Sequence, residues 1–101
     1  MPFKKHTIPN RLKAFITYRD KGICQNCGKV GKMEQYGAAT YPFWRAYERV
    51  RGKKVHFEIG HIYPESDGGM NVAENLILMC RYCNRSLGNN LWRPPEQKDN
   101  I

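Results

Sequence analysis

Residues 57–90 have the sequence FEIGHIYPESDGGMNVAENLILMCRYCNRSLGNN, which contains two short apolar runs separated by a Gly-rich stretch. Residues 57–62 form the first run, and its β-branched content and the proline that soon follows are typical of a β-strand. Residues 76–79 form the second run and predict a second strand. Between them, Gly68 and Gly69 favour a loop, because glycine accepts the positive φ values that tight turns need. The pattern therefore predicts two strands joined by a loop.

The ten residues after Cys80, RYCNRSLGNN, favour a helix that ends near their glycine. On that helix Arg81, Asn84 and Arg85 have the i, i+3 and i+4 spacing that places side chains on one face. A strand, a loop, a second strand and a helix therefore follow one another within residues 55–90. Polar side chains gathered on one helix face indicate a functional site more than a packed core.

The four cysteines form two CxxC pairs, Cys24 with Cys27 and Cys80 with Cys83. The first ten residues lack the apolar run of a signal peptide, so we expect an intracellular, cytoplasmic chain in which zinc is favoured over disulfides. Two thiolates separated by two residues in a turn can reach one tetrahedral ion at about 2.3 Å. We predict a structural Zn²⁺ on all four cysteines, with a zinc knuckle at residues 24–28. The alternative is four unligated core thiols.

The chain of 101 residues is basic, with a formal net charge of +8 and a sequence pI of about 9.5. Its length and its hydrophobic content of 41% predict one folded domain over residues 1–101. Domains this small often use a metal as a staple, because their cores supply little stability. The charge favours DNA as a polyanionic partner; the alternative is that the basic residues only aid solubility. No run approaches the roughly 18 apolar residues of a membrane helix, so we expect no membrane partner.

Four motifs resemble the HNH endonuclease family: GHI at residues 60–62, DGG at 67–69, ENL at 74–76 and CRYCN at 80–84. The resemblance is closest over the C-terminal half, and RDKGICQNCG at residues 19–28 resembles the N-terminal half of the zinc-bound members. It implies an α+β fold, a small zinc-stapled domain whose ββα-metal (HNH) catalytic unit is preceded by N-terminal helices. It also implies a metal-dependent DNA endonuclease that hydrolyses phosphodiester bonds.

Three residues receive a catalytic role from this resemblance. His61 takes the position of the general base that activates water, Asn75 the position that pins the loop, and Asn84 the last metal-ligand position. Many family members carry Asp or His immediately before the base as a further metal ligand, whereas this chain has Gly60 there. Glu58 lies two residues earlier, on the same strand face by alternation. Because carboxylate oxygens suit Mg²⁺ and Mn²⁺, we expect Glu58 to act as the substitute ligand of the catalytic ion.

Phosphodiester hydrolysis needs an activated water, neutralisation of charge in the transition state and protonation of the leaving 3′ oxygen. A neutral imidazole with a pKa of about 6.5 can take the proton of water at physiological pH. One divalent ion beside the scissile phosphate can act as a Lewis acid. We expect Arg81 and Arg85, one helical turn apart, to hold neighbouring phosphates by bidentate contacts.

Two helices are predicted before the ββα unit. Residues 7–22 have apolar side chains at helical spacing. Residues 41–51 have aromatic side chains on one side and arginines on another, which indicates an amphipathic helix. We expect the aromatic side chains to pack on the core, and Arg45 and Arg49 to contact DNA phosphates. The tail at residues 94–101 is expected to be extended or disordered.

Two functions from different classes stay open. The first is an endonuclease with one catalytic divalent ion and a separate structural zinc. The second is a catalytically impaired, zinc-stabilised DNA-binding module that lost its activity with the ligand at Gly60. A third, a zinc-ribbon domain for protein interaction, explains the cysteines but leaves His61, Asn75 and Asn84 without a role. One catalytic unit favours nicking, whereas double-strand cleavage needs a homodimer or two visits. Monomer and homodimer both stay open, as does an origin in a phage, a mobile element or a restriction system.

Overall fold

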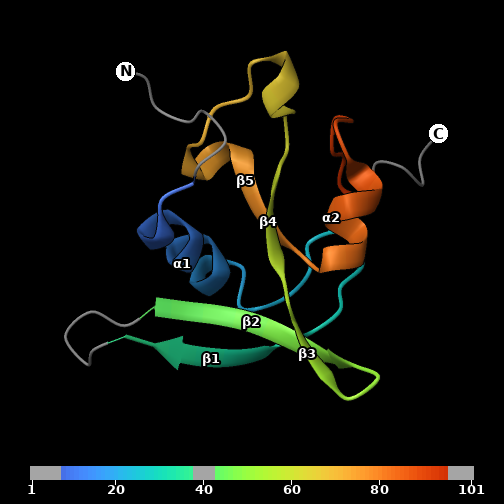
Figure 1. Cartoon of the computed structure of the whole chain (residues 1–101). Helices are drawn as coiled ribbons and strands as arrows, with labels where there is room; N and C mark the ends of the chain where they lie inside the picture. The colour runs from blue at the N-terminus through green and yellow to red at the C-terminus, as the bar shows by residue number, and fades with distance from the viewer. Residues whose placement is uncertain (1–7, 38–42, 96–101) are drawn as a thin grey trace.

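The computed structural model describes residues 8–37 and 43–95 (Figure 1). In chain order, their helices and strands are α1 (Asn10–Arg19), β1 (Lys32–Tyr36), β2 (Phe43–Val50), β3 (Lys53–His56), β4 (Glu58–His61), β5 (Leu76–Met79) and α2 (Arg81–Leu87). Two short 3₁₀ turns, Glu65–Asp67 and Ala73–Asn75, lie in the loop between β4 and β5. Within the described ranges, neither helix has the length and apolar character needed to cross a membrane.

Strands β4 and β5 pair antiparallel, with His61 opposite Leu76. The loop between them can turn because Gly68, at φ 95°, ends the first 3₁₀ turn in a left-handed conformation. Helix α2 begins directly after Cys80, whose sulfur accepts a hydrogen bond from the Cys83 N–H at 3.4 Å. The predicted order of strand, loop, strand and helix is confirmed, and with it the α+β class.

Residues 43–50 form strand β2, so the prediction of a helix over residues 41–51 is wrong. β2 is the middle strand of the sheet β1-β2-β3 and has a hydrogen-bonded neighbour on each side. Arg51 and Gly52, both at positive φ, form the two-residue turn into β3. The backbone hydrogen bonds to two neighbouring strands stabilise this segment as a strand, although its arginines have helical spacing. The aromatic residues of FWRAYERV also favour a strand. Residues 41 and 42 lie outside the described ranges.

Helix α1 is shorter than predicted, since it spans Asn10–Arg19 and not residues 7–22. It ends early because Lys21 and Gly22 have positive φ values of 59° and 71°, which turn the chain away from the helix axis. It is also the one helix that precedes the ββα unit within the described residues, where two were predicted. Residue 7 and residues 96–101, which include most of the predicted tail, are outside the part of the chain that the structure describes.

The core lies where α1, β2 and β5 meet the cysteine pairs. Every residue of β5 is buried, and Ile16 of α1 and Ala46 of β2 are at most 2% exposed. The same buried cluster contains three of the cysteines, namely Cys24, Cys80 and Cys83. The sulfur atoms are therefore part of the hydrophobic core of the domain.

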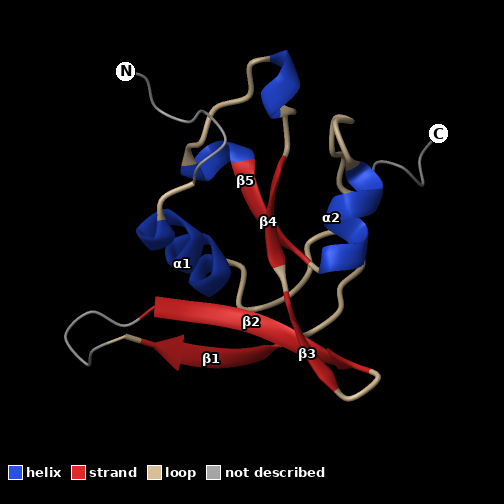
Figure 2. Cartoon of the chain, in the orientation of Figure 1, coloured by secondary structure: helices blue, strands red, loops and turns tan. Residues whose placement is uncertain are grey.

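The two β-sheets are arranged around the point where β3 continues into β4. Figure 2 shows the β4–β5 pair between the helices, with α1 on one side and α2 on the other. The sheet β1-β2-β3 crosses below them, and α1 also packs against β2. The strand that carries the predicted base therefore pairs with β5 and lies between the two helices.

Candidate active site and metal centre

The four cysteines lie together. Cys24 and Cys27 follow α1, Cys80 and Cys83 flank the start of α2, and the four sulfur atoms all lie within 4.8 Å of one another. Tetrahedral zinc with bonds of about 2.3 Å separates its sulfur ligands by about 3.8 Å, so small adjustments would seat the ion. Three of the cysteines are buried and Cys27 is exposed. The two predicted pairs are thus brought together, and their four sulfur donors fit zinc.

Backbone hydrogen bonds shape the first pair into a knuckle. The Gly28 N–H donates to Cys24 O at 2.8 Å, and Gly28 has a φ of 80° that other residues rarely adopt. The Gln25 N–H donates to Leu78 O at 2.9 Å. This contact attaches the knuckle to β5, the strand that leads into the second pair.

The surroundings of the thiols differ. At Cys24, burial favours the neutral thiol, but N–H donors of Cys27, Cys80 and Asn26 outweigh it and lower the pKa to about 7. At Cys80, burial dominates and a hydrogen bond with the Cys83 side chain acts in the same direction, so the pKa is raised to about 12. A bound cation would supply the positive charge that four neighbouring thiolates need.

Asn75 holds the loop between β4 and β5 with its side-chain amide. Its Oδ1 accepts a hydrogen bond from the Tyr63 N–H at 2.8 Å, and its Nδ2 donates to Tyr63 O at 3.1 Å and to Met70 O at 2.9 Å. Gly69 packs so close to Tyr63 O that a Cβ at this position would overlap the oxygen. The two ends of the loop are therefore drawn together around Asn75.

His61 is the last residue of β4, and its ring contacts a side chain of the same loop. His61 Nε2 and Asn71 Oδ1 are 2.7 Å apart, and both residues are partly buried. From the sequence, Asn71 is expected only as a loop residue. One sequence feature could have identified Asn71: it is an amide two residues after the Gly-Gly pair, in a loop that begins at the predicted base.

Glu58 and Asn84 meet between β4 and α2. Asn84 Nδ2 donates a hydrogen bond to Glu58 Oε1 at 3.0 Å. Asn84 Oδ1 occupies the space beside Gly60, because a Cβ on this glycine would lie 2.6 Å from that oxygen. Carboxylate and amide oxygens are donors that hard divalent cations prefer, so this pair has suitable chemistry for such an ion.

Arg81 and Arg85 lie one turn apart on α2 and both approach Glu58. Their closest nitrogens are 3.5 Å and 3.0 Å from Glu58 Oε2. Burial opposes ionisation of Glu58, but hydrogen bonds from Asn84 and Arg85 and the charge of both arginines lower its pKa. Glu58 is therefore a carboxylate at neutral pH, and the arginine side chains remain 46% and 66% exposed.

Arg45 and Arg49 lie on β2 and share one face of its sheet with Tyr47, because alternate residues of a strand point the same way. The register places His56 of β3 opposite Tyr47 on this face. Burial lowers the pKa of His56, and the positive charges of Arg45 and Arg81 add to the effect. Arg45 and Arg49 therefore form a basic face of the sheet, on strand β2 and not on the predicted helix.

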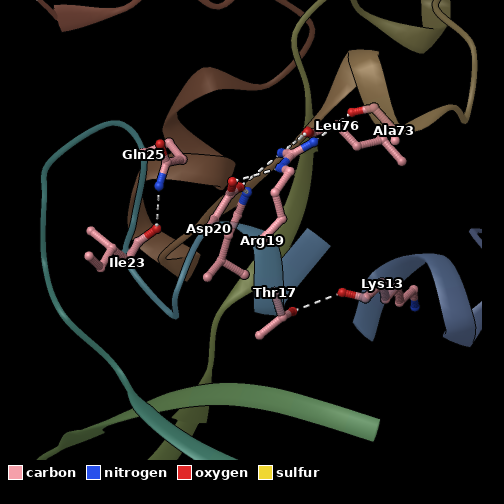
Figure 3. A network of polar contacts seen from close by, with 9 residues as sticks. Lys13, Thr17, Arg19, Asp20, Ile23, Gln25, Ala73 and Leu76 are labelled. Carbon is pink, nitrogen blue, oxygen red and sulfur yellow. Dashed lines mark hydrogen bonds and ion pairs between the residues drawn. The ribbon is translucent and has the colours of Figure 1, made fainter. Parts of the chain in front are cut away.

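Arg19 and Asp20 link the end of α1 to the segment that enters β5 (Figure 3). The Arg19 guanidinium donates to Ala73 O at 2.8 Å and to Leu76 O at 2.6 Å. The Asp20 carboxylate accepts a hydrogen bond from the Leu78 N–H at 2.9 Å and pairs with Arg19 at 2.8 Å. From the sequence, Arg19 could contact a phosphate or be solvated, and Asp20 has no expected role. Their observed backbone partners lie more than 50 positions away in the chain.

Comparison with known proteins adds two findings. Residues 48–90 match the family described as HNH endonuclease. Over 76 residues, or 75% of this chain, the sequence is 32% identical to the type IV methyl-directed restriction enzyme EcoKMcrA of Escherichia coli strain K12. The match covers 22% of that enzyme, so this chain spans about a fifth of the length of its relative.

Proposed function

We propose, on the premise that residues 48–90 match the HNH endonuclease family, that the protein is a metal-dependent DNA endonuclease that hydrolyses phosphodiester bonds. The observation that carries the proposal is the meeting of Glu58 and Asn84 beside Gly60, which offers oxygen donors at the residue that precedes the predicted base. The net charge of +8 supports a polyanionic substrate.

His61 acts as the general base in this proposal. A neutral imidazole can take a proton from the water that attacks phosphorus, while the bond from phosphorus to the 3′ oxygen breaks. Asn71 holds the ring and Asn75 holds the loop that carries Asn71. These contacts support the assignment, because a base must be kept in one orientation to act efficiently.

Glu58 and Asn84 would hold the catalytic ion, Mg²⁺ or Mn²⁺. When bound, the ion supplies Lewis-acid stabilisation of the charge that develops on the phosphate and the leaving oxygen. Arg81 and Arg85 pair with Glu58 and are exposed, so an arriving phosphate can take them as partners. Arg45 and Arg49 extend the phosphate contacts along the basic face of the sheet.

The four cysteines hold a structural zinc that takes no part in the reaction. One catalytic unit per chain cuts one strand at a time, so a monomer nicks duplex DNA and a homodimer cuts both strands. The similar restriction enzyme is methyl-directed, which makes methylated DNA a substrate to test here as well.

A zinc-stabilised DNA-binding module without catalysis is the second candidate. The observation that favours it is Gly60, since the position before the base has no side chain to bind a metal. Both candidates bind DNA and zinc. They differ in whether a divalent ion and His61 are needed for strand scission.

The decisive experiment is cleavage of supercoiled plasmid, methylated and unmethylated, with Mg²⁺, with Mn²⁺ and with EDTA. Wild type is compared with His61→Ala, and bound zinc is measured throughout because EDTA also competes for the cysteines. We expect ion-dependent scission that falls by at least about 100-fold in the variant. Nicked circles indicate a monomer, and early linear product indicates paired active sites. A wild type that binds the plasmid but never cuts it supports the second candidate.

Glu58→Gln tests the ligand assignment. The amide keeps the size of the side chain and removes its charge, so we expect the ion concentration needed for half-maximal scission to rise by about tenfold or more. An unchanged ion dependence would show that Glu58 is not a ligand. That result would leave the assignment of His61 as the base untouched, so the two assignments are tested separately.

A further inference from the structure

The contact between His61 and Asn71 points to the imidazole nitrogen that carries a proton. Nε2 lies 2.7 Å from Asn71 Oδ1. An amide oxygen has lone pairs and no hydrogen, so it can only accept, and Nε2 must be the donor. In the neutral ring the other nitrogen, Nδ1, then keeps the free lone pair.

We propose that Asn71 is a positioning residue that holds His61 in the Nε2–H tautomer, so that Nδ1 is the atom that takes the proton of water. The inference rests on the proposed function, in which His61 is the base. When Nδ1 accepts the proton, Nε2 still donates to Asn71, and the ring need not turn during the reaction. Because the amide is neutral, Asn71 orients the ring without taking its proton.

The backbone around Asn71 is built to hold this contact. Asn75 Nδ2 donates to the carbonyl of Met70, the residue before Asn71, at 2.9 Å. The Asn75 N–H donates to the carbonyl of Val72, the residue after it, also at 2.9 Å. Asn75 therefore fixes both neighbours of Asn71. In this way it helps to hold the Asn71 side chain against the His61 ring. Such support of a functional side chain by a second set of contacts sets its geometry.

The wild-type protein tests the proposal without any activity assay. Long-range ¹H–¹⁵N spectra of histidine-labelled protein at about pH 8.5, where an ordinary imidazole is neutral, distinguish the two tautomers. His61→Ala identifies which of the ring signals belongs to His61. We expect the Nε2–H form. The Nδ1–H form would mean that the Asn71 amide is turned around, and would overturn the proposal whether or not the protein cuts DNA.

Variants of Asn71 separate positioning from a merely structural role. Asn71→Asp keeps an acceptor at the same place, so we expect it to keep the tautomer. Asn71→Ala removes the acceptor, so we expect a mixture of tautomers and a fall in single-turnover scission of about 10- to 100-fold, as for other partners that orient a functional imidazole. Asn89→Ala, an exposed amide beyond α2, is the matched control and should change neither.

Two outcomes would contradict the inference. One is an Asn71→Ala protein with the wild-type tautomer and wild-type scission. The other is a loss of scission that is equal in Asn71→Ala and Asn71→Asp while the tautomer stays unchanged in both. If Asn71→Ala does not fold, the wild-type spectrum and Asn71→Asp still decide. A wild type with the Nε2–H form and no scission under any ion would overturn the proposed nuclease and leave the tautomer assignment intact.

Discussion

Gly60 has no room for a side chain, because the side-chain amide of Asn84 fills the space that a side chain would need. A Cβ at this position would lie 2.6 Å from Asn84 Oδ1 and 3.1 Å from Met79 Sδ. The usual family ligand could therefore not be restored by simple substitution, since Asp would need even more room. The position of the Asn84 side chain therefore depends on a glycine at position 60.

Gly60→Ala should reduce both stability and activity. We expect the free energy of unfolding to fall by about 1–3 kcal/mol, as is usual for an overpacked site, because Asn84 must leave its contact with Glu58. Denaturant unfolding and plasmid cleavage measure the two effects. In an Asn84→Ala background only the contact with Met79 Sδ at 3.1 Å remains, so the same substitution should cost less. Equal costs in both backgrounds would contradict the close approach.

At the scale of the elements, α1 stabilises the loop between β4 and β5 from outside it. Arg19 donates to the carbonyls of Ala73 and Leu76, which lie on either side of Asn75. Asp20 satisfies the Leu78 N–H on β5. A residue far from the predicted base in sequence therefore sets the position of the strand and turn that hold the loop.

Arg19→Met should destabilise the domain although the residue is partly exposed. The aliphatic chain is kept, but two carbonyls lose a charged donor, so we expect a loss of about 1–3 kcal/mol in the free energy of unfolding. We also expect slower scission, because the support of Asn75 is weakened. Lys21→Met removes a neighbouring exposed charge and is the control. Similar losses in both variants would point to a general effect of charge.

At the scale of the whole molecule, the cysteine cluster joins segments that are far apart in the chain. Cys24 and Cys27 follow α1, whereas Cys80 and Cys83 flank the start of α2. Three of these cysteines, Cys24, Cys80 and Cys83, are also part of a small hydrophobic core. A metal bound there would hold the N-terminal half against the ββα unit, and its loss would affect the entire fold.

Removal of zinc should therefore unfold or strongly destabilise the protein. We expect one zinc per chain, and a loss on chelation of about 3 kcal/mol or more, which lowers Tm by roughly 12 °C or more in a domain of this size. Circular dichroism during heating, with and without chelator, measures the change, and added zinc should reverse it. Cys27→Ser should weaken zinc binding in the same direction. A chelated protein with an unchanged Tm would exclude a structural role for the metal.

The distribution of basic residues predicts how DNA binding responds to salt. Each phosphate contact contributes about 0.9 to the slope of log affinity against log salt concentration. We expect Arg45→Ala and Arg49→Ala each to reduce this slope by about one contact, measured by fluorescence anisotropy with His61→Ala as the non-cutting background. Lys21→Ala should leave the slope unchanged, because it lies outside the basic face of the sheet. Equal slopes in all variants would place the DNA elsewhere.

Local patterns in the sequence were sufficient to predict the order of strand, loop, strand and helix and the two cysteine pairs that come together. Alternating apolar runs, a Gly-Gly loop and a CxxC at a helix start act over a few neighbouring residues, so they can be recognised without a structure. The same holds for His61, Asn75 and Asn84 as candidate residues, since each lies within a short motif. Their chemical roles stay predictions until the plasmid and spectroscopic experiments are done.

Tertiary structure alone decided the features that depend on distant partners. Residues 43–50 form a strand because β1 and β3 bind their backbone on both sides, and this pairing overrides the helical spacing of the arginines. Asn71 meets His61 only because the loop closes, and Glu58 meets Asn84 only because α2 packs on β4. Arg19 finds its acceptors across more than 50 residues. Such contacts depend on how elements pack, and no short stretch of sequence contains that information.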